Sequence, residues 1–252
     1  VYGAGMIAAY GITGFFLRNF LNRALVSALV ASSPVLTYYA ANFIPDTAAL
    51  GFILLSWYYF LKGRKDGTVI SLSLFFVFLT LASLIKITAA IGSLILLGLF
   101  LMSFLQKRPS FEIGQIRRGY FITFILLSLF LAAGWIQYAK YLNEKYGLGV
   151  FLMKAMTPSD LDVVKITLTH IQEIWVQFYF FKPIYYLLLL CVLVFIGFYK
   201  KVSADLRLIT LGYFGGVTAF IGLMLLQFND HDYYIITLLP LLLFLGISVF
   251  QV

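Results

Sequence analysis

The chain has 252 residues, of which 62% are hydrophobic and only 11% are charged. A soluble domain of this length needs far more polar surface, so the composition excludes an ordinary soluble enzyme and predicts an all-α, polytopic membrane protein. The net charge of +8 is spread between apolar runs and forms no single basic patch, which argues against nucleic acid as a partner.

About nine transmembrane helices are predicted, because a helix needs roughly 20 apolar residues to cross the hydrocarbon. Two apolar stretches, between Arg23 and Lys62 and between Gly67 and Gln106, are too long for one crossing and predict a hairpin each, turning near residues 42–46 and at Lys86. The expected spans are residues 1–17, 24–41, 47–61, 68–85, 87–105, 119–136, 183–199, 208–226 and 233–250. We take residues 1–252 as a single transmembrane module.

The basic residues predict how these spans are oriented. Cytoplasmic loops are enriched in Lys and Arg, and twelve of the 18 fall on one side of the alternation: Arg18, Arg23, Lys62, Arg64, Lys65, Lys107, Arg108, Arg117, Arg118, Lys200, Lys201 and Arg207. The opposite side receives Asp46, Lys86, the loop 137–182 and the sequence NDHD at residues 229–232. We expect this opposite side to face the outside of the cell.

The loop 137–182 contains a further predicted helix. After Pro158, apolar residues recur at steps of three and four, the period of one helical face: Leu161, Val164, Leu168, Ile171, Trp175 and Phe178. Ser159 and Asp162 resemble a capping box in acidic form. An amphipathic helix on the outer membrane surface and a helix packed over the bundle both fit this pattern. Elsewhere, Gly212 and Gly216 form a GxxxG pattern, which predicts close helix packing.

Candidate functional residues gather at the ends of separate hairpins on the outer side. Asp46 opens a span after Pro45, where it either caps the helix or orients an acceptor or a cation. Lys86 is the only charge in a long apolar stretch; it either reaches the lipid headgroups or serves as counter-charge for a lipid phosphate.

A third group follows in FNDHDYYIITLLP, residues 228–240. A short loop needs polar residues to sit in water, yet five such groups exceed what a loop of this length requires. The imidazole of His231, the carboxylates of Asp230 and Asp232 and the hydroxyls of Tyr233 and Tyr234 suit binding of phosphate and sugar hydroxyls. The two histidines define no metal site by spacing, and a divalent metal remains possible.

These segments resemble the membrane module of GT-C glycosyltransferases, most closely the bacterial dolichyl-phosphate-mannose-protein mannosyltransferase-like family, which is related to the lipid A aminoarabinose transferases. The resemblance covers most of the chain and rests on motifs in the family's order: Pro34, Pro45–Asp46, Lys86, and His231, Tyr233, Tyr234 and Pro240. Each motif is weak alone, and their order is more specific.

The resemblance implies sugar transfer from a polyprenyl-phosphate-linked donor to a lipid, glycan or protein acceptor at the outer face of the bacterial inner membrane. It implies substrate-binding roles for Lys86, His231, Asp232, Tyr233 and Tyr234, a catalytic role for Asp46, and no certain cofactor. The family's general base lies in a first external loop, so we expect it upstream of Val1, and we expect these 252 residues alone to be inactive. A secondary transporter or lipid flippase is the main rival; a structural membrane subunit would leave the outer cluster unexplained.

Overall fold

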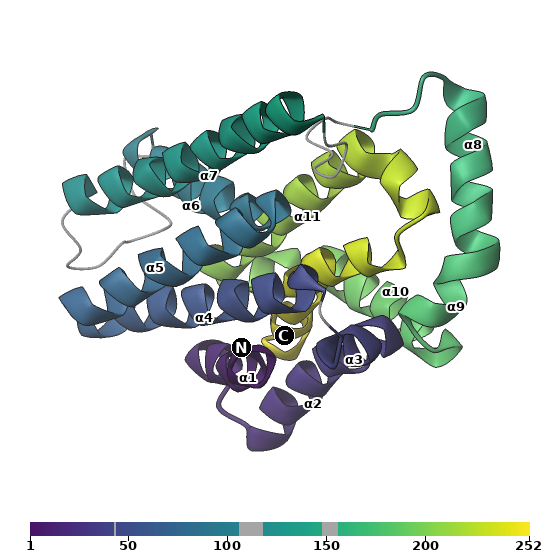
Figure 1. Cartoon of the computed structure of the whole chain (residues 1–252). Coiled ribbons are helices and arrows are strands. Elements are labelled where there is room, and N and C mark those ends of the chain that lie inside the picture. Colours follow the sequence, from purple (N-terminus) through teal and green to yellow (C-terminus); the bar gives the residue numbers. More distant parts are fainter. Residues whose placement is uncertain (43, 106–117, 148–155) are drawn as a thin grey trace.

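The computed structural model describes residues 1–42, 44–105, 118–147 and 156–252, and every regular element in these residues is a helix (Figure 1). The all-α prediction is therefore confirmed for the described part of the chain. The elements in chain order are α1 (Tyr2–Phe16), α2 (Phe20–Ala31), α3 (Pro34–Ala40), α4 (Pro45–Asp66), α5 (Val69–Ile85), η1 (Ile87–Ala90), α6 (Ile91–Leu105), α7 (Arg118–Tyr146), α8 (Leu161–His170), η2 (Ile171–Trp175), α9 (Val176–Tyr179), α10 (Lys182–Gly197), η3 (Tyr199–Lys201), α11 (Ala204–Met224), η4 (Leu225–Asn229), η5 (Asp232–Leu238) and α12 (Leu239–Phe250).

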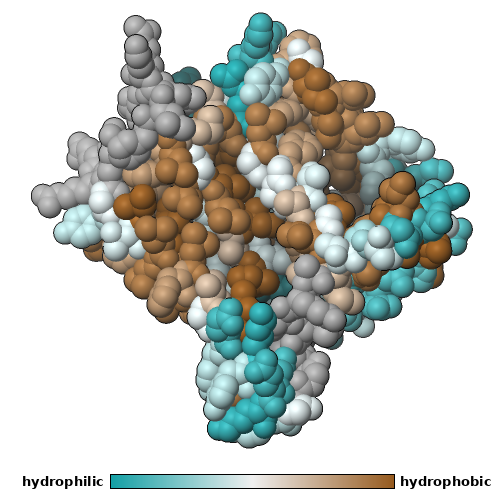
Figure 2. Space-filling view, turned by 90° about the horizontal axis from the view of Figure 1, so that it is seen from above, coloured by the Kyte–Doolittle hydropathy of each residue, from teal (hydrophilic) through white to brown (hydrophobic). Residues whose placement is uncertain are grey.

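The chain is a membrane protein by the length and composition of its helices. Within the described residues, three helical stretches are long and apolar enough to cross a bilayer: 119–146, 204–229 and 232–250. Two bent pairs, α2 with α3 and α8–α9 with α10, raise the number to five if each pair is one span. Apolar side chains cover much of the face in Figure 2, as a lipid-facing surface requires. The larger number of about nine spans stays a prediction.

The helix breaks follow local sequence signals. α5 ends at Ile85 and a new helical segment begins after Lys86, where the hairpin turn was predicted. The predicted span 24–41 is instead divided into α2 and α3, which meet at a bend of 74°. Pro34 has no N–H to donate and Ser33 accepts a hydrogen bond from the Leu36 N–H, so a new helix starts there.

The loop predicted at 137–182 begins later in the structure, because α7 continues to Tyr146. The helix predicted after Pro158 is present as α8, η2 and α9. Its cap is Asp160, whose carboxylate accepts from the Val163 N–H at 2.9 Å, so the capping box assigned to Ser159 and Asp162 is wrong. This helix packs against η4, and the Trp175 indole donates to the Asn229 carbonyl at 3.1 Å. Contact with a membrane surface stays a prediction.

Close packing at the GxxxG pattern is confirmed. A Cβ atom on Gly216 would lie 2.5 Å from Ile91 Cγ2, and one on Gly212 would lie 2.9 Å from Ile95 Cγ2. Only glycine therefore lets α11 approach α6 at this distance. The centre of the bundle is aromatic: the fully buried Trp57 donates to the Tyr213 hydroxyl and packs edge-on against Phe244 of α12.

Candidate functional site

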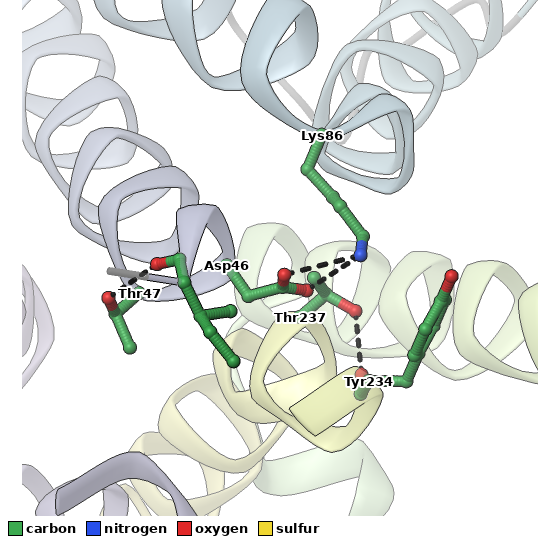
Figure 3. A network of polar contacts seen from close by, with 6 residues as sticks. Asp46, Thr47, Lys86, Tyr234 and Thr237 are labelled. Atoms are coloured by element: carbon green, nitrogen blue, oxygen red, sulfur yellow. Dashed lines mark hydrogen bonds and ion pairs between the residues drawn. The ribbon is translucent and has the colours of Figure 1, made fainter. Parts of the chain in front are cut away.

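Asp46 and Lys86 form an ion pair between two hairpins. Pro45 starts α4, which places Asp46 in its first turn, and Lys86 occupies the break between α5 and η1. The Lys86 ammonium lies 3.0 Å from Asp46 Oδ1 and 3.2 Å from Oδ2 (Figure 3). The Asp46 side chain is fully buried, and the Lys86 side chain is 17% exposed. The carboxylate thus depends on this lysine for its neutralisation.

Aromatic rings complete the surroundings of Lys86. Its ammonium lies 4.1 Å from the ring centroid of Tyr234 and 5.2 Å from that of Tyr233. The His231 ring stacks on Tyr234 with centroids 5.6 Å apart and lies tilted against Tyr233 at 5.2 Å. We call these five residues, from α4, the α5–η1 break and the start of η5, the Lys86 cluster. A cation beside electron-rich ring faces is stabilised without a second carboxylate.

Asp232 points to a different partner. The Tyr39 hydroxyl of α3 donates to Asp232 Oδ1 at 2.8 Å, and the Tyr39 ring packs edge-on against Tyr233 at 5.7 Å. The nearby Tyr179 hydroxyl is buried and has no hydrogen-bond partner among the described residues. Asp232 therefore ties α3 to the Lys86 cluster through the tyrosine rings.

Six of the seven residues proposed from the sequence come together at one end of the bundle, and the seventh, Asp230, is exposed. The sequence pattern gave no reason to choose Tyr39, because a tyrosine in an apolar helix usually marks an interface. It also gave no reason to choose Thr88, whose buried hydroxyl has no hydrogen-bond partner among the described residues.

An apolar groove of about 870 Å³ lies between α6 and α11 and adjoins the Lys86 cluster. Ile87 and Thr88, the two residues after Lys86, line it on one side. Gly215 and Phe220 line it on the other side, and the Phe220 ring stacks on Tyr234 with centroids 5.9 Å apart. Tyr234 is thus shared between the cation and the wall of the groove.

The carboxylates of this end do not fit a metal site. No group of three or more His, Cys, Asp or Glu side chains that could hold a metal ion occurs in the described ranges. Asp46 is occupied by Lys86, and Asp232 by Tyr39. We therefore derive no step through a metal ion.

The arrangement can bind an amphipathic anion. The partly exposed Lys86 side chain offers a charged donor for a phosphate, Thr88 next to it has an unpaired buried hydroxyl, and the groove that Thr88 lines offers an apolar surface for a chain. Comparisons with protein-family models, curated proteins and solved structures find no match to this chain.

Proposed function

We propose that this chain is the membrane module of a GT-C-type glycosyltransferase, which transfers a sugar from a polyprenyl-phosphate-linked donor to a lipid, glycan or protein acceptor. The observation that carries the proposal is the position of a long apolar groove beside the Lys86 ammonium: Phe220 in the groove wall stacks on Tyr234, and the Tyr234 ring lies against the ammonium. A polyprenyl phosphate has the matching chemistry, since a phosphate is joined to a hydrocarbon chain. The order of motifs around Pro45–Asp46, Lys86 and His231 supports the same class.

In this proposal the phosphate binds Lys86 and Thr88, and the isoprenoid tail lies in the groove. An acceptor hydroxyl attacks the anomeric carbon of the sugar, the bond from that carbon to the phosphate oxygen breaks, and the electron pair leaves with the polyprenyl phosphate. Lys86 stabilises the charge that grows on this leaving group. A general base takes the proton of the acceptor hydroxyl.

Asp46 acts in this reaction by holding Lys86. Its carboxylate is fully buried and ion-paired, which favours a positioning role over direct contact with an acceptor. His231, Tyr233 and Tyr234 border the phosphate site, and Tyr39 and Asp232 offer hydroxyl and carboxylate groups to sugar hydroxyls.

The orientation proposed here places the Lys86 cluster at the outer face of the bacterial inner membrane, in a bundle of about nine spans. Asp46 and Arg64 stand at opposite ends of α4, about 27 Å apart at a rise of 1.5 Å per residue. Arg64 in the last turn of α4 pairs with Asp205 in the first turn of α11. The basic segment after α4 and the basic segment before α11 therefore lie together at the end opposite the Lys86 cluster. The positive-inside rule assigns that end to the cytoplasm.

A groove-filling variant tests the proposal without touching the ion pair. A Cβ atom on Gly215 meets nothing within 4 Å, so Gly215→Leu adds a side chain inside the groove without disturbing the helix contacts. Gly222→Leu is the matched control, because Gly222 lies on the same helix, is equally open and does not line the groove. The assay is sugar transfer by the purified full-length protein from radiolabelled polyprenyl-phosphate sugars.

We expect the wild type and Gly222→Leu to transfer sugar and Gly215→Leu to lose most of the activity through a raised KM for the donor. Equal sugar-transfer rates for Gly215→Leu and Gly222→Leu would show that the groove does not bind the donor. If no donor supports transfer and the protein moves a polyprenyl-phosphate lipid across vesicles, the function is transport, because a flippase also needs a headgroup site beside an apolar groove.

A further inference from the structure

A second, polar pocket lies at the end of the bundle that carries the basic residues. Its volume is about 520 Å³, within the range of small-molecule sites. Arg18 and Asn19, between α1 and α2, form one wall, and Lys201 at the end of η3 and Ser203 just before α11 form another. Gln251, just after α12, closes the pocket and accepts a hydrogen bond from the Ser203 N–H at 3.0 Å.

The electrostatics of this pocket favour an anion. Two of the lining residues, Arg18 and Lys201, are cationic, and none is acidic. Neither cation forms an ion pair with a described residue, and both side chains are exposed. The nearest carboxylate along the chain, Asp205, is already paired with Arg64 at 2.8 Å. The positive charge of the pocket is therefore uncompensated within the described part of the protein.

The pocket lies at the end of an apolar helical stretch, where a lipid headgroup would meet the protein. Phe250 ends the apolar helical stretch 232–250 and Phe16 ends α1, and both line the pocket. The stretch 232–250 is long and apolar enough to cross a membrane, so a ligand here would have its charge beside Arg18 and Lys201 and its apolar part beside phenylalanine. Basic pockets between transmembrane helices at the cytoplasmic side are suited to anionic lipid headgroups.

We propose that this pocket binds the headgroup of an anionic phospholipid of the surrounding leaflet, with Arg18 and Lys201 contacting the phosphate. The site is separate from the Lys86 cluster and does not rest on the glycosyltransferase proposal. The probe is phosphatidylglycerol, compared with phosphatidylcholine of the same acyl chains, and the measurement is native mass spectrometry of the purified full-length protein in a nonionic detergent.

The decisive comparison uses two double variants that remove the same charge. Arg18→Gln with Lys201→Gln alters the pocket, and Lys62→Gln with Lys65→Gln alters two exposed lysines of the same end outside it. We expect the wild type to bind phosphatidylglycerol more tightly than phosphatidylcholine. The affinity of the pocket variant for phosphatidylglycerol should fall about fivefold for each basic residue removed, or roughly 25-fold in all. The control variant should keep the wild-type preference for phosphatidylglycerol.

Two further experiments test for misfolding and distinguish a lipid headgroup from a free anion. The charge-preserving variant Arg18→Lys with Lys201→Arg should bind like the wild type. Millimolar inorganic phosphate should not displace the lipid; displacement would assign the pocket to a free anion and overturn the lipid proposal. The lipid proposal would also be overturned if the two glutamine variants lost affinity for phosphatidylglycerol equally. A wild type that bound phosphatidylglycerol and phosphatidylcholine equally would overturn it too.

Discussion

The two ends of the bundle each hold an ion pair, and the pairs differ in their exposure to solvent. At one end Arg64 and Asp205 meet at 2.8 Å with side chains 17% and 28% exposed. At the other end Lys86 and Asp46 meet at 3.0 Å, and the Asp46 side chain is fully buried. The surroundings differ too, since Lys86 also lies against the rings of Tyr233 and Tyr234.

This difference decides what each pair contributes. A partly exposed pair gains little, because water solvates either partner when the other is removed. A buried pair is costly to assemble, and removal of one partner leaves an uncompensated charge without water. We infer that the Arg64–Asp205 pair contributes little to stability, whereas the Lys86–Asp46 pair fixes the position of the Lys86 ammonium.

The largest effect should come from Lys86→Ala. The substitution leaves the Asp46 carboxylate buried without a counter-charge, and we expect a loss of about 3–5 kcal/mol in the free energy of unfolding. Thermal or denaturant unfolding in detergent measures it. The double variant Lys86→Met with Asp46→Asn should recover most of the stability and remain inactive in sugar transfer. A single variant as stable as the wild type would mean that Asp46 is protonated or hydrated.

Tyr39→Phe should have an intermediate effect. It removes the hydroxyl that donates to Asp232 at 2.8 Å and leaves the ring contact with Tyr233 in place. We expect a loss of about 1.5–3 kcal/mol in the free energy of unfolding, the usual contribution of a hydrogen bond to a charged group. Tyr38→Phe is the control, because the neighbouring Tyr38 side chain is exposed. Equal unfolding midpoints for the two variants would show that Asp232 is solvated instead.

Asp205→Asn should change stability by no more than about 1 kcal/mol. It removes the carboxylate charge from the partly exposed pair with Arg64, and the amide keeps nearly the same shape. The same unfolding measurement applies, at low and at high salt. If Asp205→Asn lowered the free energy of unfolding as much as Lys86→Ala, the two ion pairs would not differ in their contribution to stability.

The sequence predicted the break at Lys86 and the polar end of the bundle, but it did not predict the bend between α2 and α3 or the contacts. Hydropathy placed the break at Lys86, since a lone charge in a long apolar stretch marks a turn. It ended a span at residue 136 because polar residues follow, yet α7 continues to Tyr146, since no proline interrupts it and a glycine with positive φ comes only at Gly147. The polarity of a sequence indicates where a span leaves the membrane. The end of a helix depends instead on a backbone signal, such as a proline or a glycine with positive φ.

The pairing of Asp46 with Lys86 lies beyond such reasoning. The two residues are 40 positions apart, and each alone had an ordinary explanation as a cap or a headgroup contact. Only the packing of α4 against α5 and η5 brings the carboxylate, the ammonium and the rings together. Thr88 was missed for the same reason, since a threonine in an apolar helix is usually satisfied by its own backbone.

The smallest effect should be local and should depend on pH. The Val163 N–H and the Ser159 hydroxyl donate to the Asp160 carboxylate, and these hydrogen bonds hold its pKa below the usual value. The cap of α8 is therefore fully effective above the unfolded pKa of about 3.9, and it is lost as the pH falls through the lower pKa of the folded state. Hydrogen exchange of the α8 amides from pH 5 to pH 2 measures this loss.

Asp160→Asn separates the charge from the cap, because asparagine caps helices about as well as aspartate and does not titrate in this range. We expect the protection of α8 to fall with pH in the wild type and to stay constant in the variant, with α12 protected in both. A parallel fall in the two proteins would mean that another group destabilises α8 in acid. Since α8 packs on η4, the side chains at that contact are the first place to look for such a group.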